Sequence, residues 1–201
     1  MCVCEMFKLG CKMKTRNIVL LISLLLFASS TAAQTRFYDV TRTFHESGFI
    51  YQADVSPGGN VILYNRDAGG RFTDLLQTFR DGTLIPEEPF ISDVISQTFT
   101  PTLARQIVRD AFSAAERNRI RPGERLGVTM IICSNTGSIK EIHFRFGRES
   151  GYATIPVATY RRIELELRRR FQFTPSAHGR NMNFIFRGWH TDVTCPRGIG
   201  R

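Results

Sequence analysis

Apolar and polar residues alternate along the chain after residue 36, which is typical of β-strands. From Phe49 to Val55 every second side chain is apolar or aromatic, as expected for a half-buried strand. The Ser-Pro-Gly-Gly-Asn sequence at residues 56–60 predicts a turn, and the apolar run at residues 61–64 predicts the partner strand. An Arg-Asp-Gly-Thr turn at residues 80–83 indicates another hairpin. We therefore predict a β-rich unit over residues 34–84.

Helical spacing replaces this alternation in two later segments. The first begins at Thr100, which can cap a helix, and Pro101, which suits a first turn, and it ends at the Arg-Pro-Gly sequence of residues 121–123. The second runs from about residue 155 to residue 171. Each carries one apolar stripe. The stripes are Leu103, Ile107, Val108, Ala111, Phe112 and Ala115 in the first helix, and Tyr160, Ile163, Leu167 and Phe171 in the second.

A hairpin separates the two helical segments. Residues 126–133 are rich in β-formers, the Asn-Thr-Gly sequence at residues 135–137 makes a turn, and residues 139–146 form the returning strand. A last strand is predicted at residues 181–186. The order helix, strand, strand, helix, strand indicates an α+β fold. We assign residues 100–190 to this unit, residues 85–99 to a proline-containing connector, and residues 191–201 to a tail.

Both helices are expected to pack on a single face of the sheet. Each has only one apolar stripe, and an antiparallel sheet can leave its other face in contact with water. On the sheet we expect Ile131, Cys133, Ile142 and Phe144 to point toward the helices.

The first 33 residues have the order of a secretory signal peptide. Lys12, Lys14 and Arg16 precede an apolar run at residues 18–28, and small residues up to Ala33 suit cleavage. That run is shorter than the roughly 20 residues that a membrane-spanning helix needs. Residues 1–12 have no fold-like pattern and indicate a false start. We therefore expect export to the periplasm, the cell surface or the medium, with no transmembrane segment in the mature chain.

Two cysteines remain after this signal, Cys133 and Cys195. An exported protein can join such a pair in a disulfide. The position of Cys133 within a strand is equally compatible with a free thiol in the core, and both alternatives stay open. A hydrophobic content of 42% with 11% aromatic residues is enough for a domain core.

The chain is basic, with a formal net charge of +9. Such a charge suits nucleic acid, an anionic glycan, anionic lipid headgroups or an acidic protein partner, and export argues against nucleic acid. On the second helix, Arg161 and Arg168 share one azimuth, Arg162 and Arg169 share another, and Leu165 lies between them. We call these five residues the arginine face and take them as the candidate binding surface. The alternative is an ordinary solvated face with Glu–Arg pairs four residues apart.

The sequence predicts no catalytic, cofactor-binding or metal site. The pairing expected around the hairpin turn puts Cys133 and His143 on opposite faces, which excludes a thiol–imidazole pair. The four histidines are scattered without the spacing of metal ligands. No glycine pair opens a helix after a strand, as a phosphate-binding loop requires.

The second half of the chain resembles the C-terminal domain of TonB-type energy transducers. The resemblance rests on two motifs. In the first, residues 133–137 (Cys-Ser-Asn-Thr-Gly) are followed by Ile139 and Ile142. In the second, residues 171–179 (Phe-Gln-Phe-Thr-Pro-Ser-Ala-His-Gly) precede the last strand. The resemblance covers about residues 101–188 and implies a sheet whose exposed edge accepts an extended peptide.

The chain departs from energy transducers because it has no retained N-terminal anchor and no long proline-rich spacer. As a whole it is similar to small secreted Bacteroidales proteins of unknown function. We expect a non-enzymatic binding module of the cell envelope whose partner is an envelope protein or peptide. The alternatives are an arginine-rich adaptor for anionic glycan or lipid headgroups, and an enzyme with an unrecognised site.

Overall fold

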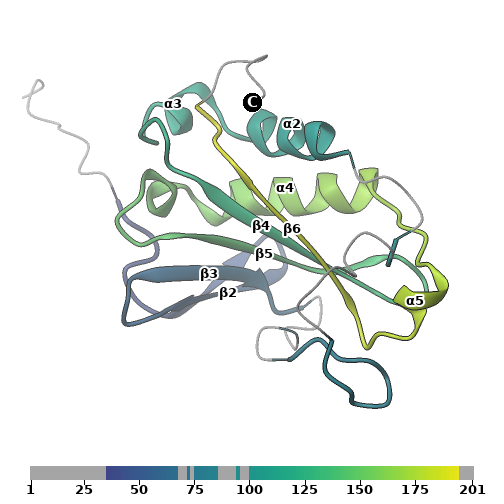
Figure 1. The fold of residues 1–201 in the computed structure, drawn as a ribbon. Coiled ribbons are helices and arrows are strands. Elements are labelled where there is room, and N and C mark those ends of the chain that lie inside the picture. The colour runs from purple at the N-terminus through teal and green to yellow at the C-terminus, as the bar shows by residue number, and fades with distance from the viewer. Residues whose placement is uncertain (1–34, 68–71, 73–74, 86–93, 96–99, 195–201) are drawn as a thin grey trace, which may run out of the picture. The chain divides into compact units, whose positions relative to one another are not determined.

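Antiparallel strands form one sheet in the order β1-β2-β3-β5-β4-β6 (Figure 1). The structure is a computed structural model that describes residues 35–67, 72, 75–85, 94–95 and 100–194. Residues from Arg36 onward belong to one compact unit. The strands are β1 (Arg42–Glu46), β2 (Phe49–Val55), β3 (Asn60–Asn65), β4 (Leu126–Ile132), β5 (Ile139–Gly147) and β6 (Ile185–Thr191).

Pairing between β3 and β5 joins the two halves of the chain. Val61 lies opposite Phe146 and Leu63 lies opposite Phe144. The β-rich region and the later helix–strand region therefore contribute to the same sheet. Together with the helices, this gives a mixed α+β fold that is mostly β-structure.

Two long helices, α2 (Pro101–Ala111) and α4 (Val157–Arg170), lie side by side on one face of the sheet (Figure 1). The two apolar stripes predict this packing, and Ile107, Phe112, Ile163 and Leu167 all enter the same core. The shorter helices are α3 (Ala114–Arg117), α5 (Ala177–Arg180) and the 3-10 turn η2 (Gly151–Thr154). Among the described residues, no helix combines the length and hydrophobicity needed to cross a membrane.

The first predicted helix is in fact two helices. α2 ends at Ala111, and α3 begins after Ser113. The Ser113 hydroxyl accepts from the Glu116 backbone N–H, and the Glu116 carboxylate accepts from the Ser113 backbone N–H. This capping box starts a new helix direction, so the prediction of one helix reaching residue 121 was wrong. Thr100 is at the N-terminal end of α2 as expected, but its side chain makes no capping hydrogen bond.

The last strand lies further along the chain than predicted. Residues 177–180 form α5, capped by the Ser176 hydroxyl, and β6 then runs from Ile185 to Thr191. The hairpin expected around residues 80–83 is present only as a bridge between Thr78 and Leu84.

A shift of register between Ile131 and Ile132 decides which side chains face the helices. Met130 lies opposite Ile142, whereas Ile131 lies opposite Glu141 on the other face of the sheet. Ile142 enters the core as predicted, as does Phe144, but Met130 and Ile132 replace Ile131. Cys133 follows the end of β4 and is only half-buried. The predicted positions of Ile131 and Cys133 were therefore wrong.

Tyr160 lies at the centre of the core between α4 and the sheet. Its ring is 5.1 Å from that of Phe144, 5.4 Å from Phe146, 6.0 Å from Tyr38 and 6.4 Å from Phe112. Aromatic pairs of this kind each contribute about 0.5–1.5 kcal/mol beyond their buried area. The cluster fixes α4 against the sheet and so determines where the outer face of α4 lies.

Candidate binding groove

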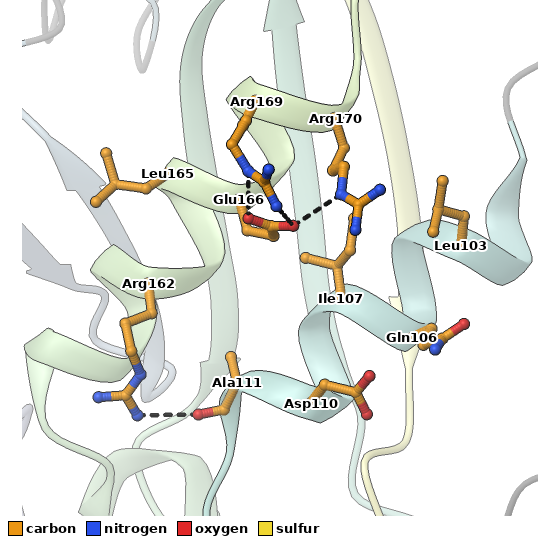
Figure 2. Close-up of a pocket in the computed structure, with 10 residues that line it drawn as sticks. All are labelled: Leu103, Gln106, Ile107, Asp110, Ala111, Arg162, Leu165, Glu166, Arg169 and Arg170. Atoms are coloured by element: carbon orange, nitrogen blue, oxygen red, sulfur yellow. Dashed lines mark hydrogen bonds and ion pairs between the residues drawn. The ribbon is translucent and has the colours of Figure 1, made fainter.

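An open groove of about 500 Å³ lies between the outer faces of α2 and α4 (Figure 2). The helices run antiparallel, so that the start of α4 lies beside the end of α2. There Arg162 donates to the carbonyl oxygen of Ala111 at 2.9 Å. The lining residues are Leu103, Gln106, Ile107, Asp110 and Ala111 from α2, and Arg162, Leu165, Glu166, Arg169 and Arg170 from α4.

Apolar side chains from both helices contribute to the groove. Ile107 is largely buried and Ala111 is half-buried, while Leu165 leaves 46% of its surface exposed. Leu165 is unusual because the other large apolar side chains of α4, such as Tyr160 and Ile163, are buried in the core. An exposed leucine beside a hollow is a contact point for an apolar group of another molecule.

Arginines rim the groove on the α4 side. Glu166 accepts from Arg169 through Nε at 2.9 Å and Nη2 at 2.7 Å, and from Arg170 through Nε at 2.9 Å. The hydrogen bonds from Arg169 and then Arg170 lower the pKa of the Glu166 carboxyl to about 2, so Glu166 is ionised at physiological pH. The terminal nitrogens of Arg170 point toward Ile107 in the groove (Figure 2).

The predicted arginine face divides into two groups of residues. Arg162, Leu165 and Arg169 line the groove. Arg161 instead stacks on the ring of Phe49 at 3.5 Å. This cation–π contact holds α4 against the start of β2.

Arg168 also lies away from the groove. It pairs with Glu164 at 2.9 Å and donates to the carbonyl oxygens of Ile139 at 2.6 Å and Lys140 at 2.9 Å. Glu164 in turn accepts from the Tyr51 hydroxyl and lies 3.4 Å from Asn65 Nδ2. Burial, followed by the charge of Glu164, raises the pKa of Tyr51 well above its ordinary value. This network holds α4 on the sheet.

Sequence reasoning missed the α2 side of the groove and also Glu166 and Arg170. Leu103, Ile107 and Ala111 repeat every four residues and were assigned wholly to the core. Only the pairing of the two helices shows that one edge of this row is accessible, and periodicity along a single helix cannot reveal it. Arg170 lies next to Arg169 in sequence, and its place in the groove depends on the neighbouring helix.

A second polar cluster lies on the opposite face of the sheet. Glu141 Oε1 is 3.2 Å from His143 Nε2, and both side chains are buried. The Tyr64 ring packs 5.5 Å from the His143 ring, and the Tyr64 hydroxyl donates to Asp54 at 2.9 Å. His143 lies opposite Thr129, not Met130, so its neighbours differ from those predicted.

The described residues contain no group of three or more metal-ligating side chains. The predicted pairing of Cys133 with Cys195 lies outside them, because residue 195 is not described. The predicted signal peptide at residues 1–33 also lies outside them. Burial alone would raise the pKa of the Cys133 thiol, but hydrogen bonds from Thr136 outweigh it and lower the pKa.

Comparison with known proteins places the chain in a family. A family model described as a domain of unknown function, DUF5043, matches residues 34–189. The crystal structure of a DUF5043 family protein from Bacteroides uniformis ATCC 8492 is similar, with a TM-score of 0.71 and 29% sequence identity over 83% of this chain and 96% of that one. No curated protein matches. None of these comparisons supports the predicted likeness to TonB domains. The chain therefore belongs to the DUF5043 family.

Proposed function

We propose that this protein is an exported, non-enzymatic binding module of the cell envelope that holds a segment of a partner protein in the α2–α4 groove. The observation that carries the proposal is the groove itself, in which apolar side chains accompany arginines at both ends. Ile107 lies between the two helices, and Leu165 lies on the outer side of α4 (Figure 2). A volume of about 500 Å³ is in the range of roughly 300–1,000 Å³ typical of ligand sites.

The chemistry of the lining favours a polypeptide ligand. Apolar side chains of a segment would displace water from Ile107 and Leu165, and its acidic groups would accept charge-assisted hydrogen bonds from the arginines. Catalysis would require a nucleophile or a general base poised against another reactive group. In the described lining, the carboxylate of Glu166 is already bonded to two arginines. This arrangement favours a structural role for Glu166 over that of a general base.

Export is part of the proposal. Its support is the order of basic, apolar and small residues over residues 12–33. In addition, the family model begins at residue 34, where the predicted mature chain begins. Recovery of mature protein from a periplasmic or extracellular fraction, with intact mass matching a start at residue 34, would test this part directly.

The groove is tested by capture of envelope proteins on immobilised wild-type protein and on the Leu165→Glu variant. The variant puts a charge in place of the exposed Leu165 of the lining and should lose a partner that wild type retains. Leu84→Glu is the matched control, because Leu84 is 62% exposed and lies in the segment around residues 75–85, outside the groove. Equal capture by wild type and Leu165→Glu, with both folded, would reject the groove as the binding site.

The edge of the sheet offers a second candidate site. β6 is an edge strand of seven residues. An extended peptide could pair with this edge through its backbone. Binding of this kind would survive Leu165→Glu and would be lost when alternate backbone amides of the peptide are N-methylated.

Charge-driven binding to anionic glycan or lipid headgroups is the remaining alternative. It predicts strong weakening between low salt and about 0.5 M salt, because the Debye length falls below about 10 Å above 0.1 M. A segment anchored by apolar contacts would lose less affinity over the same range.

A further inference from the structure

From the geometry of the groove, and on the basis of the proposed function, we infer that the bound segment is extended and carries the pattern acidic–x–apolar–x–acidic. Its two acidic side chains would meet Arg162 at one end and Arg170 at the other. Its apolar side chain would lie at Ile107 between them, and a neighbouring part of the segment would contact Leu165 on the outer side of α4.

The spacing of the two arginines sets the spacing of the acidic residues. Arg162 and Arg170 are eight positions apart on α4, which is about 12 Å along a helix that rises 1.5 Å per residue. An extended chain advances about 3.3 Å per residue, so positions i and i+4 are about 13 Å apart. Positions i, i+2 and i+4 also point to the same side of an extended chain. One segment can therefore reach both arginines and Ile107 together.

Both terminal arginines retain capacity for a ligand. The Arg162 side chain is 55% exposed, although its Nη2 already donates to Ala111 and Thr159 and lies 3.9 Å from a Glu116 carboxylate oxygen. The Arg170 side chain is 51% exposed and contacts Glu166 through Nε. A guanidinium carries five N–H donors, so each can add a carboxylate without giving up these contacts. Arg169 is bound to Glu166 through both Nε and Nη2, whereas Arg170 uses Nε alone and so keeps more N–H donors for a ligand.

Two carboxylates restrict what can occupy the middle of the groove. Asp110 on α2 and Glu166 on α4 both belong to the lining (Figure 2). A third acidic residue at the central position would face like charges and an apolar surface. The groove therefore discriminates between a segment with two separated acids and a uniformly acidic one, and this difference distinguishes selective recognition from general attraction to anions.

The test uses short synthetic peptides and the full chain. The probe contains Glu-Ser-Leu-Ser-Glu between glycines, and its affinity is measured by isothermal titration calorimetry. Moving the second Glu to position i+2 or i+6, or replacing Leu by Glu, should each weaken binding about tenfold or more, the loss expected for one charge-assisted contact. With wild-type protein, replacing either Glu of the peptide by Gln should weaken binding. Arg162→Gln should make the affinity insensitive to that replacement at one end of the peptide, and Arg170→Gln should do so at the other end. Arg148→Gln, an exposed arginine outside the groove, is the control.

Distinct results overturn the inference and the proposed function. The inferred peptide pattern is wrong if all acidic peptides bind equally well whatever their spacing, or if none binds while envelope capture still depends on Leu165. In both cases the groove remains the proposed binding site. If capture is unaffected by Leu165→Glu, the proposed function itself fails. Thermal unfolding of each variant confirms that a lost interaction does not reflect a lost fold.

Discussion

The carboxylate of Glu141 lies 3.2 Å from the imidazole of His143 in the middle of the sheet, with both side chains buried. Within the described part of the chain, neither Glu141 oxygen nor His143 Nε2 has a well-aligned hydrogen bond. Each group therefore depends on the other for compensation of its lost hydration.

Removing one partner of this pair should be costly. We expect His143→Ala to destabilise the protein by about 1–3 kcal/mol, because the buried Glu141 carboxyl group would lose its neighbouring polar partner. The double variant Glu141→Met with His143→Leu should recover most of that loss, since apolar residues of similar volume often replace a buried pair at little cost. Chemical denaturation measures both values. A double variant as unstable as the single one would show that the two residues act independently.

The inner and outer faces of α4 should respond oppositely to a charge. Ile163 is fully buried whereas Leu165 is 46% exposed. Ile163→Asp should abolish the cooperative unfolding transition, because an unpaired carboxylate would be buried in the core. Leu165→Asp should change stability by no more than about 0.5 kcal/mol. Circular dichroism during thermal unfolding distinguishes the two, and a folded Ile163→Asp protein would contradict the packing of α4.

The sequence predicted the fold class well because its signals are local. The two-residue period from Phe49 to Val55 and the stripe through Tyr160 and Ile163 each report on one element, and the structure has both elements at these positions. The Ser113–Glu116 capping box is also a local signal, but it lies within an apolar stripe that continues to Ala115 and that predicts a single longer helix.

Relations between elements could not be predicted in the same way. The register shift between Ile131 and Ile132 moves side chains to the other face of the sheet, because side-chain direction alternates with every residue. The groove depends on how closely α2 lies beside α4. Periodicity gives the azimuth of Arg162 on its own helix, but the carbonyl oxygen of Ala111 that it contacts belongs to the neighbouring helix.

Acid should weaken the contact between α3 and α4 through Glu116. Burial alone would raise the pKa of this carboxyl, but hydrogen bonds from Thr159 at 2.6 Å and the Ser113 N–H at 2.7 Å outweigh it and lower the pKa below 4.5. A lowered pKa in the folded state contributes stability above the unfolded value of about 4.5, and this is lost as pH falls through the folded pKa. Glu116→Gln should thus flatten the stability profile below pH 4.5. Urea unfolding at several pH values measures the free energy of unfolding of both proteins. If that free energy depends on pH in the same way in both, this role of Glu116 is contradicted.

Two arginines on α4 should differ in their contribution to stability. Arg168 bonds to Glu164 and to the carbonyl oxygens of Ile139 and Lys140, and its side chain is 28% exposed. Its replacement by Ala should cost about 1–3 kcal/mol, because it leaves a buried carboxylate without its charged partner. Arg169→Ala should cost about 0–1 kcal/mol, because the ion pair of Arg169 with Glu166 is exposed. Reversal of this order would mean that a groove arginine holds the fold together.

The turn at Gly137 should be the most sensitive glycine position tested. Its φ of +70° is in the left-handed region, and a Cβ atom added there would lie 1.7 Å from the carbonyl oxygen of Phe173. That contact is with backbone, and the same segment donates from Phe173 N to the Gly137 carbonyl oxygen at 3.0 Å, so neither side can move without breaking the link between the β4–β5 turn and the end of α4. Gly82 offers a matched control, because its φ is +89° but an added Cβ would have nothing within 4 Å. Gly82→Ala should cost about 1–2 kcal/mol, the conformational penalty alone. Gly137→Ala should cost several times more, because the steric clash adds to that penalty. Urea unfolding of the two variants separates the conformational penalty from the cost of the steric clash. Equal losses of stability would show that the turn does not pack against Phe173.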